Sequence, residues 1–183
     1  MKIIPRYALC SLLFVSTSAS AYELPDRSIT EAELVAAQEN WCTKLLEISD
    51  AHQNSGKAAA RELADQVIAE AYAYQLGPVL FKPTLATKPQ TFRTNHEGAL
   101  SYFVAGDPAY PDDTGFALKG WQDCQIDNAA LFISGNTASS MGKVHFTGPQ
   151  GVTSVDKSWG FVKDDKGKLR IVLHHSSLEY EPN

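Results

Sequence analysis

Residues 169–177 read Leu-Arg-Ile-Val-Leu-His-His-Ser-Ser, and this stretch carries the main indication of both the fold and the site. Its aliphatic and β-branched residues predict a strand, and side chains alternate between two faces along a strand. The face that contains Leu173 is therefore apolar until it ends in His175 and Ser177. We expect this strand to pass through a core and to bring His175 and Ser177 to the wall of a pocket.

Two helices are expected in the part of the chain that precedes the strands. Thr30 and Glu33 form a capping box, which is typical of a helix start, and apolar residues then recur at helical spacing. The Asn-Ser-Gly sequence at 54–56 breaks this helix, and a second helix is predicted over residues 57–75. Gly77, which is followed by proline, stops the second helix.

From residue 79 onward the pattern changes to short apolar segments separated by turns, which predicts strands. The candidate strands are residues 79–84, 98–105, 116–121, 129–134, 143–147, 153–163 and 168–177. The Asp-Asp-Lys-Gly sequence at 164–167 joins the last two as a hairpin turn. Helices that precede several antiparallel strands predict an α+β fold, with the helices packed on one face of a strongly curved antiparallel sheet. We expect the site in a pocket between the helices and the sheet.

The N-terminus is typical of an exported protein. The basic residues Lys2 and Arg6 precede a short apolar run, and the Ala-Ser-Ala sequence at 19–21 offers small residues for cleavage. The run is too short to span a bilayer, which takes about 20 residues, although a buried N-terminal helix is the alternative. We therefore expect a signal peptide over residues 1–21 and a single domain over 22–183, located in the periplasm or outside the cell.

The charge balance argues against two classes of partner. The chain carries 16 Lys and Arg against 21 Asp and Glu, for a formal net charge of −5, and it has no basic run. We therefore expect neither nucleic acid nor an anionic membrane surface as a partner. No apolar segment after the signal peptide is long enough to cross a membrane.

Two cysteines, Cys42 and Cys124, remain after the signal peptide. Export makes a disulfide possible, and it would connect the first helix to the sheet. Two buried free thiols are the alternative, because the sequence does not test the geometry that a bridge requires.

The histidines give little indication of a metal site. His174 and His175 are adjacent in a strand and point to opposite faces, so they cannot easily hold one ion. The other histidines have no ligand spacing, and there is no paired-cysteine motif, although residues distant in sequence can still converge on a metal. A catalytic triad built on Ser177 and His175 is not expected, because the chain has no nucleophile elbow.

Several other polar residues have a simple structural interpretation. Tyr102 shares an expected strand face with Leu100 and Val104, where a tyrosine is more often a core residue with its hydroxyl bonded to the backbone. Thr84 ends a strand, a position at which a hydroxyl is more often structural. Asp113 and its acidic neighbours are expected to lie in a solvated loop.

Five segments together indicate a family. They are Phe-Lys-Pro-Thr at 81–84, Thr-Phe-Arg at 91–93, Gly-Ala-Leu-Ser-Tyr-Phe at 98–103, Gly-Phe-Ala-Leu at 115–118 and the His-His-Ser-Ser end of 169–177. Over almost the whole mature chain, the sequence resembles the metal-independent branch of the iota-class carbonic anhydrases. The resemblance implies the cone-shaped fold of the superfamily related to nuclear transport factor 2 (NTF2-like), which also contains the association domain of CaMKII. It further suggests a homodimer.

The resemblance implies reversible hydration of carbon dioxide to bicarbonate. It carries over the hydroxyls of Thr84, Tyr102 and Ser177 and the imidazole of His175. The three hydroxyls would bind the oxygens of carbon dioxide or bicarbonate and position a water. His175 would orient these hydroxyls or transfer the proton, because its ordinary pKa of about 6.5 suits exchange near neutrality.

The apolar lining expected for this pocket comes from Leu100, Val104 and Leu173. Leu173 also stands where the metal-dependent branch of the class tends to carry a third histidine, which favours chemistry without a cofactor. Zinc or manganese remains the alternative. Without a metal, nothing in the sequence obviously lowers the pKa of water to about 7, so activation has to come from positioning and hydrogen bonds.

Two other functions remain open from the sequence. The same fold can serve as a non-catalytic module for small-molecule binding or oligomerisation, because a fold does not determine a function. A hydrolase or cyclohydrolase acting on a larger metabolite would need a metal or a nucleophile, and the sequence shows neither.

Overall fold

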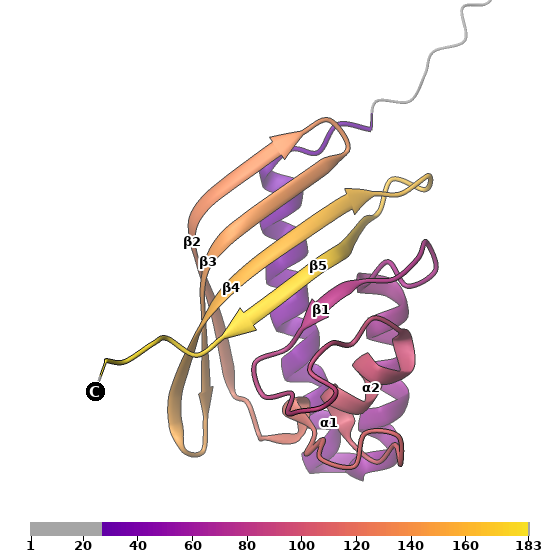
Figure 1. The fold of residues 1–183 in the computed structure, drawn as a ribbon, viewed down its shortest axis with the longest axis vertical. Coiled ribbons are helices and arrows are strands. Elements are labelled where there is room, and N and C mark those ends of the chain that lie inside the picture. Colours follow the sequence, from indigo (N-terminus) through magenta and orange to yellow (C-terminus); the bar gives the residue numbers. More distant parts are fainter. Residues whose placement is uncertain (1–26, 183) are drawn as a thin grey trace, which may run out of the picture.

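A long kinked helix and a curved five-stranded sheet dominate the structure, a computed structural model that describes residues 27–182 (Figure 1). The helix, α1, spans Glu31–Ala71 and packs across one face of the sheet. The predicted signal peptide at 1–21 lies outside the described residues. Within 27–182, no helix has the length and apolar character needed to span a membrane.

Helix α1 begins and breaks where the sequence predicts. The amide of Glu33 donates to Thr30 Oγ1 at 3.2 Å, and the amide of Thr30 donates to Glu33 Oε2 at 2.9 Å, which completes the capping box. Gly56 has φ 84° and ψ 178°, so it divides α1 into two limbs and confirms the predicted break. The second limb ends at Ala71, short of its predicted end, because Tyr72 is already extended.

Five of the seven predicted strands form the sheet. Its members are β1 (Leu80–Lys82), β2 (Asp123–Ser134), β3 (Thr137–Gly148), β4 (Gly151–Lys163) and β5 (Leu169–Ser177). In space they lie in the order β1-β5-β4-β3-β2, with β1 parallel to β5 and every other pair antiparallel. The hairpin turn predicted at 164–167 is confirmed, because the amide of residue 164 donates to the carbonyl of Lys168. The α+β fold is therefore confirmed.

Two segments predicted as strands are helical instead. Residues 96–104 form helix α2 (His96–Val104), whose N-cap Asn95 accepts from the amide of Gly98 at 2.9 Å. Residues 116–118 form a short 3₁₀ helix, η1 (Phe116–Leu118). Because every residue of α2 from Gly98 onward is buried, its sequence lacks the polar face that identifies a helix. A short apolar run of this kind cannot be distinguished from a strand by periodicity.

A disulfide fixes the first limb of α1 to the edge strand β2. Cys42 and Cys124 are bridged, with 5.5 Å between their Cα atoms, which decides between the two alternatives left by the sequence. Beside the bridge, Gln38 Nε2 donates to Asn128 Oδ1 at 3.1 Å and to Ser140 Oγ at 2.7 Å. Covalent and polar contacts therefore hold this end of the helix to the sheet.

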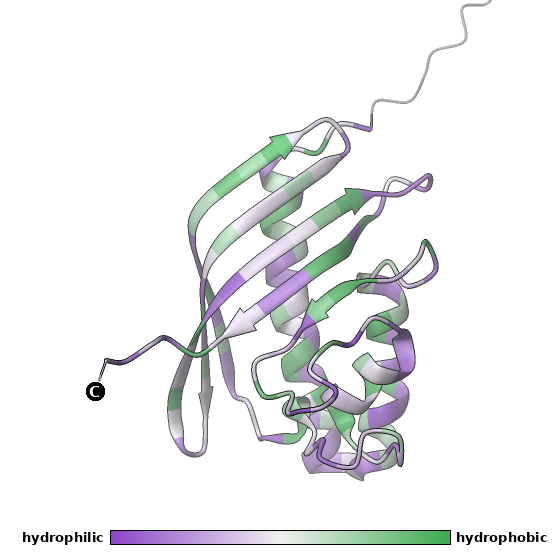
Figure 2. Ribbon diagram, in the orientation of Figure 1, coloured by the Kyte–Doolittle hydropathy of each residue, from purple (hydrophilic) through white to green (hydrophobic). Residues whose placement is uncertain are grey.

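The core lies between the helices and the inner face of the sheet. Aromatic and aliphatic side chains from α1, α2, η1 and the strands are packed there with almost no exposure; among them are Leu34, Trp41, Phe103, Phe146, Trp159 and Phe161. Figure 2 shows that β5 changes along its length from hydrophobic residues to hydrophilic ones. The polar end of β5 is thus brought against an aromatic core.

Candidate active site

The side chains of β5 do not alternate regularly between the two faces of the sheet along the whole strand, because β5 contains a β-bulge. Phe161 of β4 pairs with Ile171, whereas the preceding Gly160 pairs with Leu173, so Val172 has no partner. An extra residue in one strand exchanges the two faces for all residues beyond it. The prediction of one apolar face running from residue 169 to residue 177 is therefore wrong beyond residue 171.

The bulge determines which histidine and which serine enter the core. His174 and Ser176 are 3% and 5% exposed, whereas His175 is exposed and Ser177 is only partly buried. The expectation that His175 and Ser177 face the pocket is wrong for this physical reason. The signal that could have found the bulge is Gly160, since an isolated glycine inside a strand often marks one.

A small cavity lies against His174 and Ser176, between the helices and the sheet. About 10 Å³ of it is open to the centre of a water molecule, close to the roughly 10–15 Å³ that one water needs. Aromatic rings form most of its wall, and its polar lining consists of Thr84, Tyr102, Lys157, His174 and Ser176. The space is about that of a single water molecule, so a larger metabolite does not fit here.

Five of the other predicted site residues divide into two groups. Thr84 and Tyr102 both line the cavity, even though Tyr102 comes from a helix and not from the expected strand. Leu100 and Val104 are buried in the core but are not part of the cavity wall, because residues two apart on a helix point in different directions. Leu173 lies at the bulge, outside the cavity wall.

Two hydroxyls that follow neighbouring strands form a pair at the cavity. Thr84, just after β1, donates from Oγ1 to Ser176 Oγ on β5 at 2.8 Å. A serine hydroxyl has one hydrogen and can accept as well as donate. Since Ser176 accepts from Thr84, its own hydrogen is available to a molecule in the cavity.

A second chain of hydrogen bonds fixes the imidazole of His174. Trp41 Nε1 donates to Tyr72 Oη at 3.1 Å, and Tyr72 Oη lies 2.8 Å from His174 Nδ1. Since Tyr72 accepts from the indole, which can only donate, its own hydrogen is free to go to Nδ1. In this arrangement the neutral ring carries its proton on Nε2, which makes no hydrogen bond with residues 27–182.

The surroundings of His174 keep it neutral. Burial lowers the pKa of His174 well below its ordinary value. The ring is also stacked on Phe81, with 4.5 Å between the centroids. At neutral pH His174 is therefore a fixed N–H donor.

Tyr102 supplies a protonated phenol. Burial raises the pKa of Tyr102 above its ordinary value, and a hydrogen bond with the backbone of Leu85 opposes part of this effect. Its ring is stacked on Phe116 with 5.6 Å between the centroids. A rigid ring and a retained proton make Tyr102 a donor of fixed position.

Lys157 is not among the residues that the sequence analysis predicts for the site. Its side chain is 5% exposed, with Nζ 4.0 Å from the centroid of Trp41 and 4.6 Å from that of Trp159. It makes no hydrogen bond or ion pair within residues 27–182. Burial lowers the pKa of Lys157 well below its ordinary value. Its position in the sequence could have indicated this burial. Val155, Lys157 and Trp159 are two residues apart in β4 and therefore share one face of the strand.

A buried ion pair stands beside α2. Arg93 Nη2 lies 2.7 Å from Asp113 Oδ1, with the two side chains 3% and 5% exposed. The expectation of a solvated loop at Asp113 is therefore wrong, since its partner is distant in sequence. The charges of both residues act on the hydroxyl of Tyr102 in opposite directions, so the pair belongs to the surroundings of the cavity.

A wider pocket connects with the cavity. It has a volume of about 460 Å³ and shares Thr84, Phe116 and Val155 with the cavity wall. Leu85 and Leu178, which are 43% and 58% exposed, also line it. The shared residues make this pocket the candidate entrance for a small apolar molecule.

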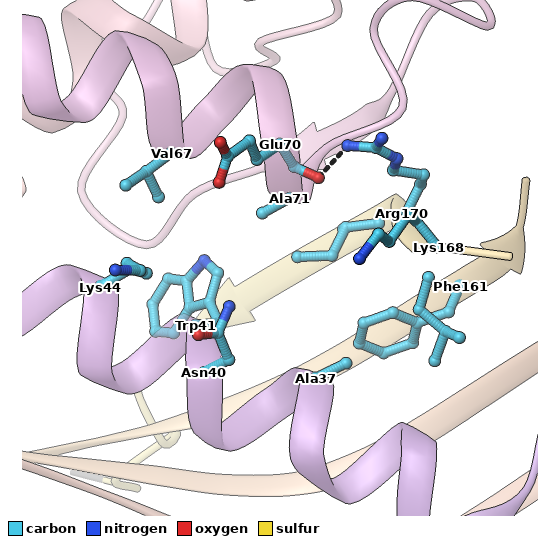
Figure 3. Close-up of a pocket in the computed structure, with 12 residues that line it drawn as sticks. Ala37, Asn40, Trp41, Lys44, Val67, Glu70, Ala71, Phe161, Lys168 and Arg170 are labelled. Carbon is cyan, nitrogen blue, oxygen red and sulfur yellow. Dashed lines mark hydrogen bonds between the residues drawn. The ribbon is translucent and has the colours of Figure 1, made fainter. Parts of the chain in front are cut away.

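A separate pocket of about 460 Å³ lies between the two limbs of α1 and the start of β5 (Figure 3). Trp41 is the only residue that it shares with the cavity. Arg170 in this pocket bonds to the carbonyl of Glu70 and to Asp164, and Lys44 is paired with a glutamate outside it. At the cavity, by contrast, Lys157 Nζ and His174 Nε2 make no hydrogen bond within residues 27–182. The cavity at His174 is therefore the stronger candidate.

The arrangement of the side chains within residues 27–182 does not favour a metal site. In the part of the chain from residue 27 to residue 182, no three histidine, cysteine or acidic side chains lie close enough to hold an ion. The cavity itself is lined by one histidine, two hydroxyls, a phenol and an amine. This donor set is poor for zinc, which is usually held by several histidines, thiolates or carboxylates.

Known proteins show clear similarity to this chain. A family model described as metal-independent carbonic anhydrase matches residues 32–178. A curated protein of Nostoc sp. strain PCC 7120, named metal-independent carbonic anhydrase, is 56% identical over 167 residues, which cover 91% of this chain and 82% of that protein. All residues that line the cavity lie within the region matched by the family.

Solved structures are similar as well. The crystal structure of an iota-carbonic anhydrase from a cyanobacterium, complexed with bicarbonate, has a TM-score of 0.85 at 56% identity and covers 88% of this chain and 99% of that chain. An NTF2-like protein of unknown function from Shewanella oneidensis MR-1 has a TM-score of 0.45 at 13% identity, over 80% of this chain and 97% of that chain.

Proposed function

This chain belongs to the metal-independent carbonic anhydrase family, and we propose that the cavity at His174 is where it hydrates carbon dioxide. The activity and the absence of a metal cofactor, both implied by the sequence resemblance, are confirmed by the family and by its similar proteins. The observation that carries the proposal is the set of fixed donors, Ser176, Tyr102 and His174, in a small aromatic cavity that shares part of its wall with the wider pocket.

The cavity suits both sides of the reaction. Carbon dioxide is apolar, and the aromatic wall offers it an apolar surface. The attack of water places negative charge on an oxygen of carbon dioxide, where the hydroxyl of Ser176, the phenol of Tyr102 and His174 Nε2–H can donate. Donors that are fixed before the reaction need no reorganisation when the charge develops.

Two of the three donors are each held by a neighbouring hydroxyl. Thr84 orients Ser176, and Tyr72 orients His174. The roles that the resemblance gave to Ser177 and His175 thus pass to Ser176 and His174. Thr84 acts mainly through Ser176, and Tyr102 keeps the donor role first expected for it.

Stopped-flow measurement of carbon dioxide hydration tests this proposal. Because removing one such donor costs about 10²–10³ in rate, Tyr102→Phe and Ser176→Ala should lower kcat/KM by about that factor. His175→Ala and Ser177→Ala are matched controls from the next positions of the same strand, and they should retain most of the activity. Activity that survives Ser176→Ala but not Ser177→Ala would contradict the placement of the site.

We also propose that the protein is exported. The N-terminal pattern supports export, and so does the Cys42–Cys124 disulfide, because disulfides persist mainly in oxidising compartments. Cell fractionation and the mass of the mature chain test this. A chain that keeps Met1 and remains with the cytosol would contradict it.

A homodimer is proposed through the outer face of the sheet. Phe132 on β2, Met141 on β3 and Val152 on β4 are 71%, 62% and 66% exposed there. Large apolar side chains exposed on one face favour association. Light scattering should give twice the mass of the chain, and Phe132→Glu with Met141→Glu should halve it.

A further inference from the structure

We propose that Lys157 is the general base of the hydration step: its neutral amine takes a proton from the attacking water and then pairs, as ammonium, with the bicarbonate formed. This inference rests on the proposal that the cavity at His174 is the reaction site. It supplies what the three hydrogen-bond donors do not, namely an acceptor for the proton that leaves the water.

The position of Lys157 follows from the register of the sheet. Lys157 of β4 is the partner of Ser176 of β5 in the antiparallel pair, and both side chains face inward and line the cavity. Facing residues of neighbouring strands have Cβ atoms about 4.5–5.5 Å apart. The amine and the hydroxyl that would bind carbon dioxide therefore belong to the same small space.

The charge balance of the cavity favours a neutral amine before the reaction. The titratable groups that face Lys157 are His174 from β5 and Tyr102 from α2, with Tyr72 behind His174, and no carboxylate lines the cavity. An ammonium that is buried without a carboxylate loses its hydration and gains no ion pair. Burial accordingly lowers the pKa of Lys157, which leaves a lone pair available near neutral pH.

The same surroundings tolerate the ammonium once it forms. Nζ lies 4.0 Å from the ring centroid of Trp41, 4.6 Å from that of Trp159 and 5.5 Å from that of Phe146. The faces of aromatic rings attract cations. The bicarbonate produced beside the ammonium gives it the counter-ion that the protein does not provide.

The step is balanced in atoms and charge. The water oxygen forms a bond to the carbon of carbon dioxide, and the electron pair of one C=O π bond moves onto an oxygen held by Ser176 and Tyr102. One O–H bond of the water breaks, and its proton forms an N–H bond with Lys157. Two neutral molecules and a neutral amine become bicarbonate and an ammonium in contact, so no unpaired ion is created. Bicarbonate then leaves, and the ammonium returns its proton to solvent.

Two substitutions separate a base from a fixed charge. Lys157→Met keeps a linear side chain without the amine, and Lys157→Arg keeps a cation that cannot act as a base. General base catalysis contributes about 10²–10⁴ in rate, so both variants should lose at least about 100-fold in kcat/KM. Lys157→Met should unfold at the same or a higher temperature, because it removes a buried polar group. A variant at Lys143, an exposed lysine of β3, serves as the control and should keep its activity.

NMR of the protein with labelled lysine measures the protonation state of Lys157 directly. The Nζ signal of Lys157 is the one that is lost in Lys157→Met. The signal should titrate well below the ordinary value of 10.5, and bicarbonate should shift its titration upward. In the wild type, kcat/KM should rise with pH through the same inflection.

Three results would overturn the inference. They are retention of more than half of the activity in Lys157→Met, full activity in Lys157→Arg, or an Nζ that stays charged up to pH 10. If Ser176→Ala and Tyr102→Phe lose activity in the same assay, only the role of Lys157 fails. If those variants are also active, the proposed site itself fails.

Discussion

At the scale of residues, the donor-to-acceptor direction of two hydrogen-bond chains determines which side chains can donate a hydrogen bond into the cavity. Trp41, Tyr72 and His174 form one chain, and Thr84 with Ser176 forms the other. In each chain, the first donor occupies the acceptor of the next group, so that the last group presents its own hydrogen to the substrate. A residue that never touches carbon dioxide can therefore set the rate.

Tyr72→Phe tests this effect through a residue that only positions the imidazole. Without the hydroxyl, His174 can place its proton on either nitrogen, so kcat/KM should fall by about tenfold while KM changes less. Stability should fall by about 1–3 kcal/mol, because Trp41 Nε1 loses its acceptor. Tyr74→Phe removes the hydrogen bond to the carbonyl of Arg93 instead and should lower stability without lowering kcat.

The buried imidazole also predicts how stability depends on pH. Because burial lowers the pKa of His174 in the folded protein, the unfolded chain binds a proton near pH 6.5 that the folded chain does not bind. The free energy of unfolding should therefore fall as pH falls from 7 to 5. Urea denaturation should show a shallower fall in His174→Phe and an unchanged fall in His175→Ala. Equal slopes in the wild type and His174→Phe would contradict this.

At the scale of elements, the bulge in β5 depends on a glycine in the neighbouring strand. A Cβ added at Gly160 would lie 3.0 Å from Cβ of Leu173, which is tighter than packed side chains normally allow. The absence of a side chain at Gly160 thus leaves space for Leu173, which lies at the bulge of β5. The position of the site in β5 is fixed by contacts with β4.

Gly160→Ala should disturb the register of this pair. Overpacking typically costs about 1–3 kcal/mol, and movement of His174 and Ser176 should lower kcat/KM at temperatures where the variant is still folded. Thermal unfolding and stopped flow measure the two effects. Ser158→Ala, a nearby change on the same strand, is the control, and an equal loss in both variants would contradict a specific role for Gly160.

Local signals in the sequence predicted the elements, and contacts between elements decided the rest. The capping box at Thr30, the break at Gly56 and the turn at 164–167 each depend on a few neighbouring residues, and all three are confirmed. Helix α2 was not predicted, because burial on all sides removed its polar face. His174 and Ser176 line the cavity where His175 and Ser177 were expected, because the unpaired Val172 is visible only when β5 is paired with β4. Thr84 and Tyr102, which the family resemblance implied, both line the cavity.

At the scale of the whole molecule, a disulfide ties the long helix to the edge of the sheet. The Cys42–Cys124 bridge joins them across 82 positions of the sequence. On the sheet, the cavity residues come from β1 and the segment after it, and from β3, β4 and β5. The bridge therefore stabilises the shell of the cavity without entering the chemistry.

Replacing both cysteines with serine should lower the stability of the protein. Closing a loop of this length accounts for about 4 kcal/mol in the unfolded chain, so the double variant should unfold at a clearly lower denaturant concentration. Carbon dioxide hydration at 25 °C should be retained by the fraction that remains folded. Adding a reducing agent to the wild type should reproduce the shift, and an unchanged midpoint in both experiments would contradict it.

The size of the cavity has a consequence for inhibition. The cavity is small, so it should exclude inhibitors that are wider than the substrate. Linear anions of three atoms, such as cyanate or azide, should compete with carbon dioxide, whereas tetrahedral anions such as sulfate should not. Compounds that inhibit by binding to a catalytic metal have no target here, so selective inhibitors of this enzyme should be found among small linear anions.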